Sequence, residues 1–144
     1  MNAIGDKVYL TSSDLRRKVT LALSGKLRHD FNFHIPDSEY YLTPMEDVKR
    51  LVERDKIDRR EYASEVGDCD DFAFLLKAAF IRHAWDEGKR RAPHSVGIIW
   101  GMLPHGHAIN WVLTRQEGLY FIEPQTDEIF KPRKTDKDIW MMMA

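Results

Sequence analysis

The sequence predicts an α+β fold, because helical and strand patterns occupy different parts of a chain of 144 residues. Apolar residues recur at helical spacing within residues 1–90 and alternate with a period of two within residues 94–132. We find no internal repeat, low-complexity tract or linker that divides the chain. A chain of this length can bury one core. We therefore expect a single domain over residues 1–144, with a helical part followed by a sheet part.

Composition and charge exclude several classes of function. The chain has 22 Lys and Arg against 23 Asp and Glu, so nothing in its charge favours a nucleic-acid partner. No apolar run approaches the ~20 residues that cross a bilayer, so we expect no membrane partner. The N-terminal stretch lacks a signal-peptide pattern and the single cysteine cannot form an internal disulfide, which favours a cytoplasmic location. The oligomeric state stays open.

Two amphipathic helices are predicted in the first part of the chain. The first begins near Ser12 and carries apolar residues at helical spacing until Gly25 ends it. The second has a capping box formed by Thr43 and Glu46, followed by an apolar stripe along one face. Between them, residues 28–41 contain Pro, Asp and Ser and indicate an ordered loop that carries aromatic side chains.

A third helix has a different pattern. The segment Phe72–Ile81 is apolar at every position except Lys77, so we expect a central helix buried on all sides. Asp68 is a suitable N-cap, and Asp71 three residues later can accept bonds from first-turn amides. The single cysteine, Cys69, then lies in the first turn of this helix.

Strand patterns follow a predicted loop over residues 85–94. Period-two alternation and intervening turns at residues 116–118 and 125–127 predict an antiparallel sheet of about four strands. The expected strands cover residues 94–103, 107–114, 119–124 and 128–132. The apolar tail, residues 138–144, is expected to pack against the domain itself.

Cys69, His107 and Glu123 are the candidates for thiol chemistry. A nucleophilic cysteine needs a device that favours the thiolate, and a helix N-terminus with a nearby imidazole is such a device. His107 begins one predicted strand and Glu123 ends the next. Because neighbouring antiparallel strands run in opposite directions, these two side chains should meet at one end of the sheet.

Three segments together resemble the transglutaminase-like branch of the papain-like cysteine peptidases, over about residues 62–130. They are "GDCDDFAFLLKAAF", similar to the family's cysteine helix, "GHAINWV", similar to its histidine strand, and "FIEPQT", similar to its acidic strand end. The likeness is strongest to bacterial and phage members. It implies a papain-like fold in which N-terminal helices cover a central cysteine helix that packs on the antiparallel sheet.

The resemblance also implies an activity. Cys69 would be the nucleophile, His107 its base and Glu123 the residue that orients the imidazole, in an enzyme that cleaves or transfers an acyl group at a peptide or isopeptide bond. The implied partner is a protein or peptide, including a peptidoglycan peptide, and no cofactor or metal is expected. Asn110 and Asp127 are rival residues for orienting His107.

Further residues surround this expected triad. The backbone N–H of Cys69 would serve the oxyanion hole, with Tyr62 in place of the Gln or Trp that relatives supply upstream. Asp68 and Asp71 would be structural acids that cap the helix. The surrounding candidates, for the oxyanion hole or for support of the triad, are Tyr62, Asp68, Asp71, Asn110 and Gln125.

Three other interpretations stay open at this point. Cys69, Asp70, His107 and Glu123 include the side-chain types that ligate zinc, although no ligand-pair spacing supports such a site. The same fold could instead be a catalytically weak or inactive binding module. A peptidoglycan amide hydrolase is the third alternative.

Overall fold

The computed structural model describes residues 8–88, 91–116 and 118–144. Its helices are α1 (Ser12–Ala22), α2 (Met45–Arg54) and α3 (Cys69–His83), with a short 3-10 turn at Ile57–Arg59 and a π-helical turn at Ala84–Gly88. Its strands are β1 (Tyr9–Thr11), β2 (Leu27–His34), β3 (Glu39–Tyr41), β4 (Val96–Met102), β5 (Gly106–Thr114), β6 (Gly118–Glu123), β7 (Glu128–Phe130) and β8 (Lys137–Met143). Parts of the predicted loop at 85–94 and turn at 116–118 lie outside the described residues.

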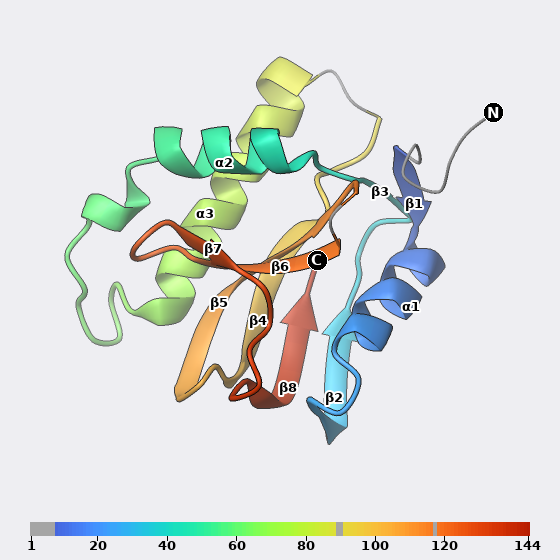
Figure 1. Ribbon diagram of the computed structural model, residues 1–144. Coiled ribbons are helices and arrows are strands. Elements are labelled where there is room, and N and C mark those ends of the chain that lie inside the picture. The colour runs from blue at the N-terminus through green and yellow to red at the C-terminus, as the bar shows by residue number, and fades with distance from the viewer. Residues whose placement is uncertain (1–7, 89–90, 117) are drawn as a thin grey trace.

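The main sheet has six strands in the order β2-β8-β4-β5-β6-β7 (Figure 1). Every neighbouring pair is antiparallel except β2 and β8, which are parallel, so the sheet is mixed. The prediction of about four antiparallel strands is therefore wrong. β1 and β3 form a separate two-stranded ribbon, so the part of the chain predicted to be helical also contains strands.

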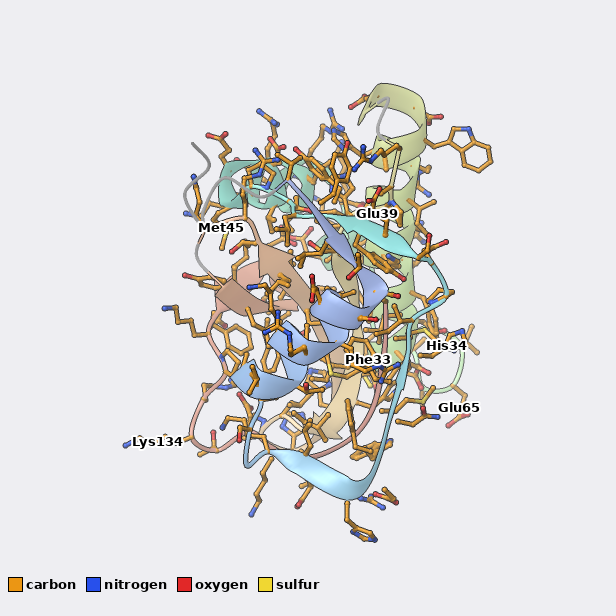
Figure 2. The ribbon with its side chains drawn as sticks, turned by 90° about the vertical axis from the view of Figure 1, so that its right-hand side faces the viewer. Phe33, His34, Glu39, Met45, Glu65 and Lys134 are labelled. Carbon is orange, nitrogen blue, oxygen red and sulfur yellow. The ribbon has the colours of Figure 1, made fainter. Side chains whose placement is uncertain are left out.

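β2 replaces part of the loop predicted over residues 28–41. Burial alternates over its second half, residues 31–34, with Phe33 buried and His34 exposed at the next position (Figure 2). Charged residues on the exposed face hid this alternation in the sequence. β8 contains the predicted apolar tail, and its Ile139 and Met142 are fully buried between β2 and β4.

Two apolar clusters cover the two faces of the sheet. Leu15 and Val19 of α1 and its C-cap residue Leu23 pack with buried residues of β4, β5, β6 and β8 on one face. Helices α2 and α3 pack on the other face, where Leu76 and Phe80 of α3 belong to one apolar cluster with Val112 of β5. Figure 1 accordingly shows α1 on one side of the sheet and α2 and α3 on the other.

α3 begins as the sequence predicts, but it is not buried all round. Asp68 is the N-cap, and its backbone N–H donates to the Asp71 carboxylate at 3.2 Å. Phe74, Leu75 and Ile81 are 39–45% exposed, since α3 covers one face of the sheet and nothing in the described residues covers its outer side. None of the described helices has the length and apolar character needed to cross a bilayer.

Helix α1 begins at Ser12 as predicted but ends at Ala22, before Gly25, and the start of α2 differs from its prediction. Thr11 caps α1, and its hydroxyl oxygen accepts the backbone N–H of Asp14 at 3.2 Å. The capping box predicted for α2 does not form. Pro44 is the N-cap residue of α2, while the Thr43 hydroxyl bonds Nδ1 of the buried His94 at 2.8 Å.

Candidate functional site

The hairpin of β5 and β6 brings His107 and Glu123 together. Asn110 of β5 lies opposite Ile122 of β6, so the start of one strand and the end of the other reach the same end of the sheet. His107 Nε2 and Glu123 Oε1 are 2.5 Å apart. The second carboxylate oxygen, Oε2, accepts the backbone N–H of Gln125 at 3.3 Å. Two bonds therefore fix the Glu123 carboxylate beside the imidazole.

This pair has a defined chemistry. An ionised carboxylate only accepts hydrogen bonds, so Nε2 of His107 carries the proton and Nδ1 is an acceptor when the ring is neutral. The imidazole of His105 stacks on that of His107, with ring centroids 5.0 Å apart. The side chains of His107 and Glu123 are 9% and 19% exposed. The end of the sheet thus presents an imidazole acceptor, Nδ1, and a fixed carboxylate at a partly accessible position.

Contacts between α3 and the sheet place Cys69 at the same end. The Asn110 amide donates to the carbonyl of Ala73 at 2.9 Å. One turn later, Lys77 Nζ donates to the carbonyl of Val96, which lies opposite Val112. Moving toward the start of α3 therefore corresponds to moving toward the start of β5, and Figure 1 shows both starts at one end of the sheet.

The thiol does not join the pair. Cys69 is partly buried and free. Within the part of the chain that the structure describes, no hydrogen bond connects it to His107. The structure therefore brings two of the three expected triad residues into contact and leaves the third nearby without a bond.

Tyr62 lies beside Cys69 on the surface. Its ring is 54% exposed and stacks on Phe72, with centroids 6.4 Å apart and planes at 14°. Loss of hydration around the hydroxyl, with the nearby charges of Cys69 and Asp68, raises the pKa of Tyr62. This side chain offers an open aromatic face rather than an enclosed hydrogen-bond donor.

The acids of the first turn of α3 serve the helix itself. The Asp70 carboxylate accepts the backbone N–H of Asp71 at 3.1 Å, and Asp71 accepts that of Asp68. One ligand atom from each of the three lies within 4.8 Å of the others, so this group could approach a cation. The zinc set considered from the sequence, which combined Cys69 and Asp70 with the hairpin residues, does not gather in the described structure.

The two rival residues for orienting His107 are engaged elsewhere. Asn110 is fully buried and donates to the carbonyls of Ala73 and Gly97, so it connects α3 to the sheet. Burial, followed by the carboxylate of Asp58, raises the pKa of Asp127 to about 6. Asp127 therefore faces Asp58 beside the 3-10 turn.

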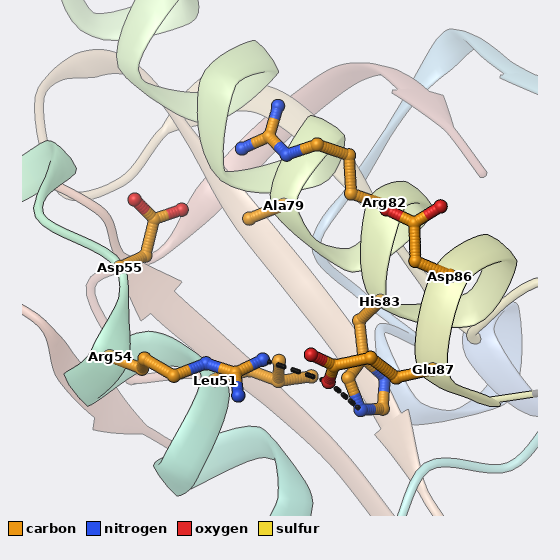
Figure 3. Close-up of a pocket in the computed structure, with 8 residues that line it drawn as sticks. All are labelled: Leu51, Arg54, Asp55, Ala79, Arg82, His83, Asp86 and Glu87. Carbon is orange, nitrogen blue, oxygen red and sulfur yellow. Dashed lines mark hydrogen bonds and ion pairs between the residues drawn. The ribbon is translucent and has the colours of Figure 1, made fainter.

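Sequence reasoning missed a pocket at the other end of α3, where it faces the C-terminal end of α2 (Figure 3). Its volume is about 320 Å³. A helix of 15 residues is about 20 Å long, so the pocket lies well away from Cys69. Asp55 and Arg82 line it, and their places in the sequence carry no motif spacing that could have indicated a site.

Comparisons with known proteins give a family and a fold. The family model described as agglutinin C-terminal matches residues 40–129. A solved structure described as "PSL1a-E64 complex" is 24% identical with a TM-score of 0.78. A structure of Polyporus squamosus lectin, bound to the human-type influenza-binding epitope Neu5Aca2-6Galb1-4GlcNAc, is 22% identical with a TM-score of 0.75. No curated protein sequence matches the chain.

Each solved structure matches 96% of this chain, which spans about half of theirs (50%). At these identities the likeness establishes a shared fold. The papain-like, transglutaminase-like fold expected from the sequence is wrong, because the chain instead has the mixed six-stranded sheet and the fold of these lectin structures. Three short segments carried that expectation, and each of them is weak alone.

The predicted function is corrected with the fold. The family model and the solved lectin contradict a cysteine peptidase of the bacterial or phage type, an acyl-transferring enzyme with a Cys69, His107 and Glu123 triad, and a peptidoglycan amide hydrolase. They equally contradict a protein or peptide substrate. A helix start packed beside a β-hairpin can bring a thiol, an imidazole and a carboxylate close together without defining a reaction.

Proposed function

This chain belongs to the agglutinin C-terminal family, and we propose on that premise that it binds glycans. The observation that carries the proposal is the match of 96% of the chain to a lectin structure that contains a bound glycan epitope. Because this chain spans half of that protein, its own glycan binding is a separate matter that experiment must test.

The proposed binding surface, here named the His107 edge, is formed by His107 and Glu123 at the end of the sheet and by Tyr62 near the start of α3. Sugar hydroxyls both donate and accept hydrogen bonds, so they suit a fixed carboxylate beside an imidazole. The exposed ring of Tyr62 can pack against the apolar C–H face of a pyranose. The Gln125 backbone bond holds Glu123 in place before any ligand arrives, which lowers the entropic cost of binding.

Local charge selects among glycans. Glu123 lies at this edge, and three further carboxylates lie at the start of α3, on the N-cap residue Asp68 and on Asp70 and Asp71 of the first turn. A glycan that carries a carboxylate would meet like charges here. The His107 edge should therefore prefer a neutral glycan to one that ends in an acidic sugar.

The test is a titration of the chain with the neutral disaccharide Galb1-4GlcNAc and with the sialylated trisaccharide formed by extending it, followed by NMR chemical shifts. We expect the neutral glycan to bind with a Kd of about 1 mM or tighter, and the sialylated one more weakly. His107→Ala and Glu123→Gln should each weaken binding about tenfold. Cys69→Ser should leave the affinity unchanged.

Glu46→Gln is the matched control, because Glu46 is an exposed carboxylate at the start of α2, and Thr43 just before that helix pairs with Thr114 at the other end of β5. A chain that binds neither sugar, although its spectrum shows it folded, would contradict the proposal and assign glycan recognition to another part of the longer proteins. Unchanged binding in both His107→Ala and Glu123→Gln would contradict the His107 edge.

A further inference from the structure

The pocket between the C-terminal ends of α2 and α3 has one wall whose charges satisfy one another. Arg54 Nη2 is 3.1 Å from Glu87 Oε2, and His83 Nε2 is 3.6 Å from the same oxygen (Figure 3). This group spans the pocket from α2 to the turn after α3. Asp55 and Arg82 lie on the opposite wall and take no part in this group.

Asp55 holds an unsatisfied oxygen on that opposite wall. It is the C-cap residue of α2, and its backbone N–H donates to the carbonyl of Leu51 at 3.0 Å. Its carboxylate oxygen Oδ2 is buried and has no hydrogen-bond partner. A buried acceptor without a donor is costly, more so when it is charged. Because Asp55 also lines the pocket, a donor that binds there can contact its carboxylate.

Arg82 supplies the complementary group. Its side chain is exposed, and among the described residues it forms no ion pair. Figure 3 shows its guanidinium and the Asp55 carboxylate on the same side of the pocket, with Ala79 between them. A guanidinium can bind a carboxylate through two parallel N–H bonds. The wall thus presents the Asp55 carboxylate and the Arg82 guanidinium next to an apolar surface, and Asp86 adds a second carboxylate to the pocket lining.

We propose that this pocket binds a small zwitterion of the amino-acid type. The ligand's ammonium group donates to Asp55, and its carboxylate binds the Arg82 guanidinium. Its apolar side chain packs on Ala79 and Leu51. Helix α2 ends at this pocket, and the partial negative charge of its last carbonyls also favours the ammonium group. A volume of about 320 Å³ accommodates a single amino acid.

The experiment titrates the whole chain with L-leucine and with two analogues that each lack one charge. Isoamylamine lacks the carboxylate, and isocaproate lacks the ammonium group. We expect leucine to shift the NMR signals of residues around Ala79 with a Kd of about 1 mM, and both analogues to bind about tenfold more weakly. The analogues test the proposal on the unmodified protein, without dependence on the folding of a variant.

Two variants test the assigned contacts. Asp55→Asn and Arg82→Gln should each weaken leucine binding about tenfold. Glu53→Gln and Arg50→Gln are the controls, because these residues are exposed on the same helix α2 and do not line the pocket. Absence of shifts at about 10 mM leucine would overturn the proposal, as would equal affinity for leucine and isoamylamine.

The leucine titrations test this pocket whether or not the chain binds glycans. The His107 edge lies at the other end of α3, and variants of Glu123 report on it alone. Leucine binding that persists in Asp55→Asn and in Arg82→Gln would also overturn the assignment, because the two charges would then have no role.

Discussion

Asn110 of β5 donates its side-chain amide to the backbone carbonyl of Ala73 in α3, at 2.9 Å, from a position without solvent exposure. The same amide donates to the carbonyl of Gly97 on β4 at 3.1 Å. One side chain therefore connects the helix that carries Cys69 to two strands of the sheet. The position of the start of α3 relative to His107 depends on this connection.

Asn110→Ala should lower the free energy of unfolding by about 2 kcal/mol, because it removes two buried hydrogen bonds and leaves a small void. Urea unfolding measures the change. Asn32→Ala is the control, since Asn32 is exposed on β2 and its loss should cost little. Equal effects at the two positions would show that the bonds of Asn110 do not stabilise the fold.

Gly97→Ala should destabilise the sheet severely, by about 3 kcal/mol. A Cβ atom at Gly97 would lie 1.9 Å from the carbonyl oxygen of Met143 and 2.7 Å from Nε1 of Trp111. These atoms are hydrogen-bonded to one another, so neither can move freely. Thermal unfolding measures the loss. Gly106→Ala on β5 is the control, because nothing lies within 4 Å of its added Cβ. A similar Tm for both variants would contradict the close approach.

Lys77 should make stability rise with pH in the alkaline range. Burial lowers the pKa of Lys77 from 10.5 to about 8, with Asp37 opposing the shift. Between these values the unfolded chain holds a proton that the folded chain has lost, so stability increases with pH, by up to about 3 kcal/mol. Urea unfolding from pH 7.5 to 10.5 should show this rise in the parent but not in Lys77→Met. Lys49→Met, at an exposed position of α2, should keep the rise.

Asp127 should make the stability of the fold fall as the pH rises from 4 to 7, which is the opposite sign to the effect of Lys77. Burial and the neighbouring Asp58 raise the pKa of Asp127 from 3.8 to about 6, so the folded chain binds this proton more tightly than the unfolded chain. The stabilisation is full below pH 4 and is lost as the pH rises through 6. Asp127→Asn should therefore be more stable than the parent at pH 7, by about 1 kcal/mol after allowance for solvent screening.

Asp138→Asn is the control for this comparison, because both residues have positive φ, 66° for Asp127 and 48° for Asp138, and Asn accepts that conformation. Asp138 is exposed. The stability difference between Asp127→Asn and the parent should shrink toward pH 4. A stability difference that does not change with pH would show that folding does not raise the pKa of Asp127.

Local pattern predicted the elements that fold by local rules. The start of α3 at Asp68 and the successive strands β4, β5 and β6 follow from capping residues, alternation and turns. Pattern failed for β2 and for the place of β8, because partners far along the chain decide whether a charged or continuously apolar segment becomes a strand. The exposed outer side of α3 was missed for a related reason. An apolar helix surface does not reveal whether anything covers it.

One part of the candidate site could be predicted from local pattern and another part could not. Hairpin geometry alone was enough to predict that His107 and Glu123 lie together, and the structure places them in contact. The orientation of the Cys69 thiol depends on how α3 sits on the sheet, which no local pattern encodes. The chemistry inferred from these three residues was wrong because residue types at one place do not by themselves define an activity.

The parallel pairing of β2 with β8 has a kinetic consequence. Leu27 lies opposite Ile139, on the order of a hundred positions later in the chain. Synthesis delivers the earlier strand long before its neighbour exists, and closing so long a loop is entropically costly. The antiparallel strands β4, β5 and β6 can assemble during that interval. Refolding of this chain should therefore be slow, with β2 acquiring its protection from hydrogen exchange last.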